Sequence, residues 1–294
     1  MKRLLVVTNA AAGTADEQNI AAAVAVLRAG ADVRVEQCAD PADLATLIEA
    51  RDGRQLVLAG GDGSAHLLVA TLHGRGELSP DNPIGLLPLG TGNDLARTLG
   101  IPLDAEAAAS ALLTGRARRL DLIVDDAGGV VVNVVHVGIG AQAAEQASAL
   151  KDKIGKAAYA VGSAVAGVRE QGWTLRVEVD GAVVHDGEPV LMVGVCNGRT
   201  IGGGAEIAPD AEPDDGLLDV VVATSTGPLA RLGFGVAIRS GEHVDRDDVQ
   251  TFRGRRVTVS GEAFPANADG ELHDPVESRS WTLLSQAWAL VVPA

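Results

Sequence analysis

Aromatic side chains are scarce in this chain of 294 residues, which has three Trp, one Tyr and three Phe. Stacking platforms for nucleic-acid bases therefore have almost no material. Basic residues are outnumbered, with 24 Lys and Arg against 39 Asp and Glu, and the net charge is −15. A surplus of this sign repels phosphodiester backbones and anionic lipid headgroups. We therefore exclude nucleic acid as a partner bound through bulk charge.

Cysteine and long apolar runs are also missing. The two cysteines, Cys38 and Cys196, are too few for a disulfide framework or a zinc site, and they suit a reducing cytosol. The apolar run 4–7 is too short for a signal peptide and has no small-residue cleavage site after it. The helical run 157–168 is shorter than the ~18 residues that span a membrane. We expect a cytoplasmic protein whose membrane contact is peripheral, at the inner face.

The hydrophobic residues, 47% of the chain, must build the core from Val, Leu, Ile and Ala, which suits buried parallel strands. Through the first 120 residues, short apolar runs alternate with helical stretches, the pattern of βα units on a parallel sheet. This pattern predicts a doubly wound α/β domain. The expected strands are 3–8, 33–36, 55–59 and 84–87, and the expected helices are 16–29, 41–50, 64–72 and 93–99.

After about residue 120 the hydrophobic pattern changes to period two, as in 173–179, which predicts antiparallel strands. Asp180-Gly181 and Gly128-Gly129 are hairpin signals, the second one before a strand at 130–135. We expect a β-sandwich with one inserted helix near 151–170. The last run, 281–292, has a spacing that allows a strand or a helix. The predicted domains are 1–120, completed by 280–294, and 121–279.

The strongest local motif is Gly60-Gly61-Asp62-Gly63-Ser64, the first glycine loop, between an expected strand and an expected helix. Glycines let the backbone approach a bulky anion, and a helix N-terminus directs N–H groups at a phosphate. The motif is neither a Walker A nor the Gly-x-Gly-x-x-Gly fingerprint. The alternative is a plain strand-to-helix turn in which Ser64 is the N-cap. Three glycines around one carboxylate favour a functional loop.

A second glycine loop, 88–97, follows one βα unit later with the sequence Pro-Leu-Gly-Thr-Gly-Asn-Asp-Leu-Ala-Arg. Two such loops at adjacent strand ends define the crevice in which open α/β sheets bind ligands. Its alternative is a helix start capped by Asn93.

Together the two glycine loops resemble those of the diacylglycerol kinase catalytic domain family, which includes bacterial lipid kinases and has sphingosine and ceramide kinases as relatives. The resemblance extends in family order to the segments 133–140, 208–219 and 269–271. It implies an ATP-dependent lipid kinase with a nucleotide-binding α/β domain and a β-sandwich that accepts a diacylglycerol-like lipid. The implied cofactors are ATP and Mg²⁺, and the surplus of acids makes the cation a requirement.

The resemblance also implies a role for individual residues. Glu271 would accept the proton of the lipid hydroxyl, Asp269 would lie beside it in a metal or water network, and Asp62 would complete the catalytic set. Magnesium would be held by Asp215, helped by backbone oxygens near Glu212 and Leu217. The residues that would bind the nucleotide are Asn9, Gly13, Cys38, Gly60, Gly61, Asp62, Gly63, Ser64, Thr91, Gly92 and Asn93.

The sequence departs from the family pattern at several positions. Leu67 stands where the family has Glu, the turn after the first strand keeps only Asn9 and Gly13, and Gln142 weakens the case for a sphingoid base. The segments 212–216 and 269–271 could also be only a type I turn and a hairpin turn. Two alternatives stay open: a kinase of a soluble acceptor, as in NAD kinases and phosphofructokinases, and a nucleotide- or lipid-binding sensor without turnover. Homodimer formation is also open.

Overall fold

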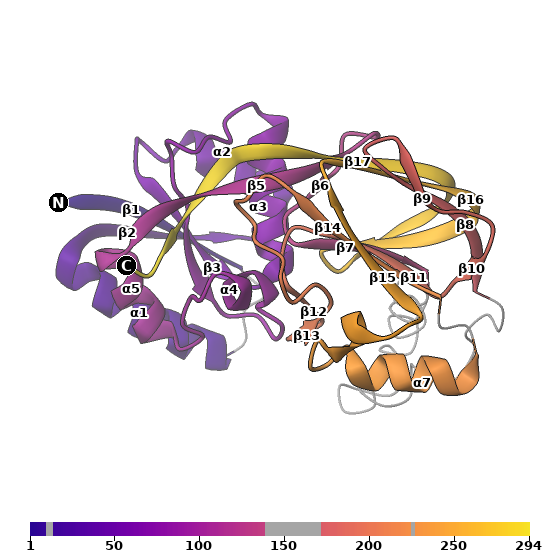
Figure 1. Cartoon of the computed structure of the whole chain (residues 1–294). Coiled ribbons are helices and arrows are strands. Elements are labelled where there is room, and N and C mark those ends of the chain that lie inside the picture. The colour runs from indigo at the N-terminus through magenta and orange to yellow at the C-terminus, as the bar shows by residue number, and fades with distance from the viewer. Residues whose placement is uncertain (10–13, 139–171, 225–226) are drawn as a thin grey trace. The chain divides into compact units, whose positions relative to one another are not determined.

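The computed structural model describes residues 1–9, 14–138, 172–224 and 227–294 (Figure 1). The expected helix near 151–170, Gly13 and Gln142 lie outside these residues. The described chain divides into two compact units. The parallel-sheet unit consists of residues 1–122, 213–215 and 284–294, and the antiparallel unit consists of residues 123–212 and 216–283.

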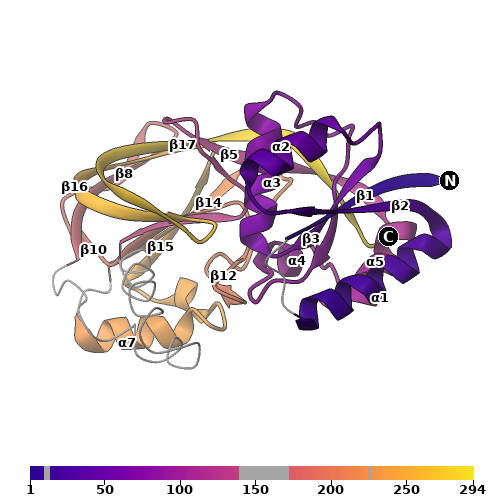
Figure 2. The ribbon, with the colours of Figure 1, turned by 180° about the vertical axis from the view of Figure 1, so that it is seen from behind.

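The parallel-sheet unit has a four-stranded sheet in the order β2-β1-β3-β4, with every pairing parallel. Figure 2 shows α1 and α5 together on one face of this sheet and α2 and α3 on the other. The predicted doubly wound α/β architecture is confirmed, and the structure adds α5, which the sequence analysis did not predict. The elements are β1 (Lys2–Asn9), α1 (Thr14–Gly30), β2 (Ala31–Cys38), α2 (Pro41–Glu49), β3 (Gln55–Gly60), α3 (Asp62–Gly74), β4 (Gly85–Pro88), α4 (Asp94–Thr98) and α5 (Ala105–Thr114).

Local chemistry explains where these elements begin. Residues 4–8 of β1 are all buried, as expected of a central strand covered on both faces. Helix α2 begins after Asp40, whose side chain accepts the N–H groups of Ala42 and Asp43, with Pro41 at the first helical position. Helix α5 is capped in the same way by Asp104. The helix that the sequence analysis missed is thus specified by one N-cap and a run of alanines.

The end of the chain returns to the parallel-sheet unit as a strand. Leu290 forms a parallel bridge with Ile84, whose N–H donates to Ala289 O at 2.9 Å and whose O accepts from Val291 N at 2.8 Å. Trp288 is 1% exposed, and its indole N–H donates to Asp121 O at 3.0 Å. The spacing of 281–292 allowed a strand or a helix, and the edge beside β4 selects the strand.

An 11-stranded sheet contains the path β15-β14-β11-β7-β16-β17-β5-β6, and β8 joins it through β16. Two clusters of buried residues, mostly Val, Leu, Ile and Ala together with Trp173, Phe264 and Trp281, form the core of the antiparallel unit. The division between the units falls within β5 and within β17. The elements are β5 (Arg116–Asp125), β6 (Val130–Val131), β7 (Val134–Gly138), β8 (Trp173–Val179), β9 (Ala182–His185), β10 (Pro189–Val190), β11 (Met192–Cys196), β12 (Thr200–Ile201), β13 (Ala205–Glu206), β14 (Leu218–Ala223), α7 (Pro228–Ala237), the 3-10 helix η2 (Glu242–Asp245), β15 (Val249–Gly254), β16 (Arg256–Ala268) and β17 (Glu271–Val292).

Both predicted hairpins are present. Asp180 and Gly181 have positive φ values of 51° and 82° in the turn between β8 and β9, as a two-residue hairpin turn requires. Strands β5 and β6 pair across the turn that contains Gly128. The strand expected at 130–135 is interrupted at residues 132 and 133, and that expectation was wrong. The reason is that these residues donate their N–H groups to a side chain, Asp269, rather than to a neighbouring strand.

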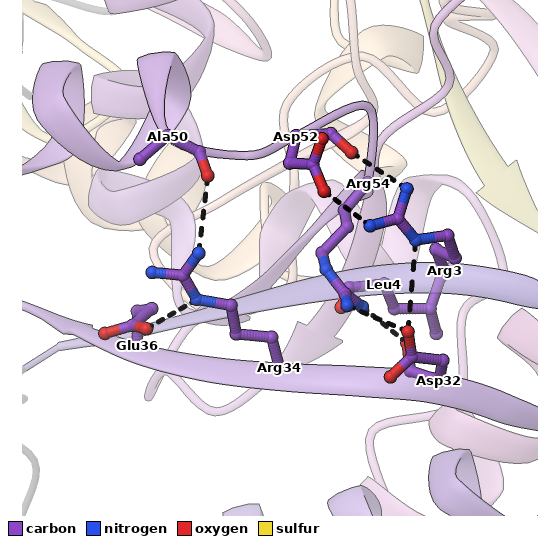
Figure 3. A network of polar contacts seen from close by, with 8 residues as sticks. All are labelled: Arg3, Leu4, Asp32, Arg34, Glu36, Ala50, Asp52 and Arg54. Carbon is purple, nitrogen blue, oxygen red and sulfur yellow. Dashed lines mark hydrogen bonds and ion pairs between the residues drawn. The ribbon is translucent and has the colours of Figure 1, made fainter.

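A network of ion pairs lies at the amino ends of β1, β2 and β3 (Figure 3). Arg3 joins Asp52 at 2.6 Å, and Arg54 joins Asp32 at 2.8 Å. The Arg3 guanidinium lowers the pKa of the exposed Asp52 carboxyl by hydrogen bonding. Parallel strands place their amino ends at one edge of a sheet, so this network and the two glycine loops lie at opposite edges.

Candidate active site

The first glycine loop is a tight transition from strand to helix. Strand β3 ends at Gly60, and α3 begins at Asp62 with Gly61 as an extended N-cap that makes no side-chain capping bond. The first intrahelical bond runs from Ala65 N to Gly61 O at 3.0 Å. Ser64 is therefore the third helical residue and not the N-cap that the plain-turn alternative required. A Cβ on Gly60 would lie 2.8 Å from the Ser64 Cβ, so the turn itself demands this glycine.

The two glycine loops touch each other through their backbones. Strands β3 and β4 pair side by side, with Gly60 opposite Pro88, so the predicted adjacency of the loops is confirmed. A Cβ on Gly61 would lie 2.7 Å from the Gly90 Cα, and a Cβ on Gly90 would lie 2.5 Å from the Gly61 Cα. Both distances are too short for any side chain, so this contact is open to glycine alone.

Asp62 links the first loop to the helix after the second. Its Oδ1 accepts the N–H of Leu95 at 3.0 Å, which supplies an acceptor at the start of α4. Asn93 stands at the N-cap position with φ 52° but makes no capping bond. Its side chain instead accepts from Gly90 N at 2.9 Å and donates to Gly90 O at 2.7 Å. The capping role considered for Asn93 thus belongs to Asp62, and Asn93 closes its own loop.

Gly63 differs from the other glycines of the loop because packing does not require it. It is exposed, and a Cβ there would have no atom within 4 Å. Gly63 and Ser64 precede the first intrahelical hydrogen bond, so their N–H groups have no partner in the helix ladder. The amino end of α3 therefore has N–H donors, the positive end of the helix dipole and free space, which together suit a phosphate.

Asn9 and Cys38 end the neighbouring strands β1 and β2 and are paired in register. They lie at the carboxyl edge of the sheet, the edge that carries the two glycine loops. The Cys38 thiol donates to Asp40 O at 3.1 Å, and partial burial raises the pKa of this thiol. Asn9 is exposed.

The acidic turn at 212–217 is tied to β5. Arg118 donates from Nε and Nη2 to the two carboxylate oxygens of Asp214, at 2.7 and 2.6 Å. This guanidinium holds the pKa of Asp214 below its usual value. The N–H of Asp121 donates to Pro213 O at 2.7 Å. The turn is therefore anchored immediately before Asp215.

The oxygen donors of this turn suit a hard cation. The Glu212 carboxylate forms an ion pair with Arg199, whereas Asp215 is exposed. In the described ranges, no group of three His, Cys, Asp or Glu side chains gathers closely enough to hold a metal ion. Carboxylate, main-chain carbonyl and water oxygens are the ligands that Mg²⁺ prefers.

Asp269 and Gly270 form a two-residue hairpin turn between β16 and β17, and Glu271 follows it. Asp269 and Gly270 have positive φ values of 50° and 94°, and Ala268 pairs with Glu271. The turn considered as the alternative for this motif is therefore real. Asp269 is half-buried and accepts three backbone N–H groups, whereas the Glu271 side chain is exposed.

The sequence analysis missed several polar residues that organise these segments. Asp121 is 0% exposed, and its carboxylate accepts the N–H of Gln286 at 2.7 Å. The signal was available, because Asp121 is an acid inside the apolar run 120–124. Arg118 had no comparable signal, since a lone arginine in a strand is usually solvated.

Two family models match this chain. The diacylglycerol kinase catalytic domain matches residues 3–124, and the YegS C-terminal NAD kinase beta sandwich-like domain matches residues 133–291. The "Probable lipid kinase YegS-like" of Pseudomonas aeruginosa (strain UCBPP-PA14) is 34% identical over 95% of this chain and 89% of its own length. The chain belongs to the YegS-like and diacylglycerol kinase family. The predicted family and the predicted kinase class are thereby confirmed.

Other members of the lipid kinase family agree in sequence and in fold. The diacylglycerol kinase of Mycobacterium tuberculosis (strain CDC 1551 / Oshkosh) is 30% identical over 75% of this chain and 71% of its own length. A solved structure named as a "putative diacylglycerol kinase" from Bacillus anthracis str. Sterne has a TM-score of 0.78 at 23% identity, with 99% of this chain and 95% of that chain covered. In the part of the chain that the structure describes, no helix is long and apolar enough to cross a membrane.

Proposed function

We propose that this kinase transfers the γ-phosphate of ATP to the hydroxyl group of a diacylglycerol-like lipid. The observation that carries the proposal is the pair of touching glycine loops, with the open space over Gly63 at the amino end of α3. Phosphoryl transfer depends on positioning and charge neutralisation more than on covalent chemistry by the protein. A rigid loop pair that presents N–H groups to an anion meets the first requirement.

The nucleotide is bound along the carboxyl edge of the parallel sheet. The phosphates lie over the amino end of α3, where Gly63 leaves space and the N–H groups of Gly63 and Ser64 are donors. Asp62 holds the second loop in register through Leu95, so that its substitution disturbs both loops. The remaining contacts are assigned to the strand ends and the two turns: Asn9, Gly13, Cys38, Gly60, Thr91, Gly92 and Asn93.

Magnesium neutralises the phosphate charge when it is bound with ATP. A chain of net charge −15 repels a polyanionic nucleotide, so nucleotide binding without the cation is unfavourable. Asp215 supplies the carboxylate, with backbone oxygens near Glu212 and Leu217. Arg118 binds the Asp214 carboxylate, and Asp215 is the exposed acidic residue of the turn.

Glu271 acts as the general base. It takes the proton of the lipid hydroxyl, the hydroxyl oxygen bonds to the γ-phosphorus, and the bond from that phosphorus to the β–γ bridging oxygen breaks so that ADP leaves. The Glu271 side chain is exposed, as a group that meets an incoming substrate must be.

Two features support a lipid as the acceptor. The relatives carry lipid kinase and diacylglycerol kinase names across most of this chain. The second glycine loop ends in Asn93-Asp94-Leu95-Ala96-Arg97, which resembles lipid kinases more than kinases of NAD or sugar phosphates. We therefore propose a cytoplasmic enzyme that meets its substrate by transient contact with the inner face of a membrane.

The test is an acceptor panel. Purified protein with Mg·ATP is offered diacylglycerol, ceramide, sphingosine, undecaprenol, NAD and fructose 6-phosphate, with the lipids in mixed micelles. We expect phosphorylation of diacylglycerol or a close relative, and a loss of at least ~10²-fold in turnover for Glu271→Gln. Glu277→Gln, an exposed glutamate on the same strand, is the matched control. Phosphorylation of a soluble acceptor alone would overturn the lipid proposal, and nucleotide binding without transfer to any acceptor would favour the sensor.

A further inference from the structure

The carboxylate of Asp269 holds a segment far away in the sequence. Its Oδ2 accepts the N–H of Val132 at 2.6 Å, and its Oδ1 accepts those of Asn133 and Val134 at 2.9 and 3.1 Å. The backbone N–H of Asp269 donates to Val134 O at 3.0 Å. One residue at a hairpin turn thus makes four hydrogen bonds to three consecutive residues.

These bonds replace a strand ladder at the point where β6 ends and β7 begins. Backbone N–H groups in a partly buried segment need acceptors, and the Asp269 carboxylate supplies them. The other side of the segment is also fixed. Asn133 O accepts from Asn197 N at 2.8 Å and Gly198 N at 2.9 Å, and the Asn197 side chain donates to Val132 O at 2.9 Å.

The same network fixes the turn that precedes Glu271. The N–H of Gly270 donates to Oδ1 of Asn267, a residue that is 5% exposed, at 3.0 Å. Asp269 is in the left-handed region, and Ala268 pairs with Glu271 to begin β17. The backbone of Glu271 is therefore set by a turn that is bonded on one side to Asn267 and on the other to residues 132–134.

We infer that Asp269 is a positioning residue for Glu271 and that it transfers no proton itself, an inference that rests on the proposed function. A proton on the Asp269 carboxylate would remove the charge that strengthens its three bonds to the N–H groups of residues 132–134. A rigid turn keeps the exposed Glu271 carboxylate in the geometry that proton abstraction needs. Asp269 thus sets the geometry of the turn, and Glu271 accepts the proton.

The first arm of the test follows backbone hydrogen exchange, which needs no turnover. In Asp269→Asn, the amide group can accept with one oxygen but presents its NH₂ to the third donor. We expect the exchange of the Val132, Asn133 and Val134 amides to accelerate by at least ~10-fold, because opening no longer breaks a charged bond. Glu271→Gln and the exposed control Asp274→Asn should leave these amides protected. Unchanged exchange in Asp269→Asn would overturn the inference.

The second arm measures kcat, KM and their pH dependence with Mg·ATP and diacylglycerol. A positioning role predicts that Asp269→Asn lowers kcat by about 10- to 100-fold, since a misplacement of about 1 Å has effects of that size. It also predicts a KM for ATP near the wild-type value and an acid limb of the pH profile that persists. Loss of this acid limb in Asp269→Asn, with the limb retained in Glu271→Gln, would assign the proton to Asp269 and overturn the inference.

A second variant covers the case in which Asp269→Asn does not fold. Asn267→Ala removes the acceptor of the Gly270 N–H and loosens the turn without touching either carboxylate. We expect a smaller fall in kcat with the acid limb retained, and wild-type kcat in this variant would count against positioning by the turn. If the wild-type protein transfers no phosphate to diacylglycerol, the proposed function fails, whereas the exchange arm still decides whether Asp269 holds residues 132–134.

Discussion

The two units of this kinase assemble their candidate chemistry in different ways. In the parallel-sheet unit, two glycine loops meet backbone to backbone, with 2.7 and 2.5 Å between a notional Cβ and the opposite Cα. In the antiparallel unit, a single carboxylate gathers three N–H groups from a segment more than 130 positions earlier. The glycine loops depend on the absence of Cβ atoms, which lets their backbones touch. The antiparallel unit depends on the Asp269 carboxylate, which accepts backbone N–H groups.

This difference determines how each site can be damaged. A methyl group added to Gly61 or Gly90 forces two backbones apart, which no side-chain rearrangement can relieve. Removal of the Asp269 charge leaves backbone donors without partners, but the strands around them keep their pairing. Substitutions at Gly61 or Gly90 should therefore act through steric conflict, and substitution of Asp269 through the loss of a hydrogen-bond acceptor.

The largest effect is expected from Gly61→Ala. The new Cβ would lie 2.7 Å from the Gly90 Cα, so the loops must separate. We expect turnover to fall by at least ~10²-fold and the free energy of unfolding to fall by about 1–3 kcal/mol. Gly90→Ala should reproduce both changes because it acts on the same contact. Kinetic assays and urea unfolding measure the two quantities, and wild-type turnover in both variants would refute the contact.

Gly63→Ala sharpens the comparison, because Gly63 is a glycine of the same loop that packing does not require. Its Cβ would enter open space, and alanine favours the helix by up to about 1 kcal/mol. We expect equal or higher stability together with about 10-fold weaker binding of Mg·ATP, since the methyl group occupies the space assigned to a phosphate. Calorimetric titration and thermal unfolding test this. Gly74→Ala, at the far end of α3, should change stability alone, and unchanged ATP affinity in Gly63→Ala would contradict the phosphate assignment.

His136 provides a smaller, pH-dependent test of the antiparallel unit. It is 8% exposed on β7, and burial lowers its pKa to about 4. The unfolded chain takes up a proton near the ordinary pKa of 6.5, whereas the folded chain resists it, so stability is lost as the pH falls from about 6.5 to about 4. Between pH 7 and pH 5, the wild-type protein should lose about 1–2 kcal/mol more than His136→Leu. Equal losses in urea unfolding would show that His136 is not buried as a neutral group, and the exposed His273→Gln is the control.

The smallest effect is expected for the ion pair that anchors the acidic turn. Arg118 lowers the pKa of Asp214, so its stabilisation is present above the ordinary carboxyl pKa and is lost as the pH falls through the lowered value. At pH 7, Arg118→Ala should reduce the free energy of unfolding by about 1 kcal/mol, and this difference should disappear once the pH falls below the lowered pKa of Asp214. Arg119→Ala breaks an ion pair that is 54% and 80% exposed and should change little. An equal loss of unfolding free energy in both variants at pH 7 would contradict a special role for the Arg118–Asp214 ion pair.

Local patterns in the sequence predicted much of the architecture and some of the site. The period-two pattern of 173–179 and the Asp180-Gly181 turn gave β8 and its hairpin, because alternation and left-handed turn residues are local requirements. The strand expected at 130–135 did not form as one element, because Asp269 competes for its N–H groups. Ser64 has the chemistry of an N-cap, but the helix begins earlier, because Gly61 O accepts the first helical bond from Ala65 N.

By itself, the sequence determined the class of each segment, the places of the glycine turns and the membership of a lipid kinase family, since these depend on residue type and spacing along the chain. The tertiary structure decided which glycines are required by a backbone contact and which glycine leaves open space. It also decided which carboxylates accept backbone N–H groups. Asp62 and Asp269 look alike in the sequence, as acids beside glycines. Their roles differ because hydrogen-bond partners depend on proximity in space and not along the chain. The N–H group bound by Asp62 lies 33 positions away, and those bound by Asp269 lie more than 130 positions away.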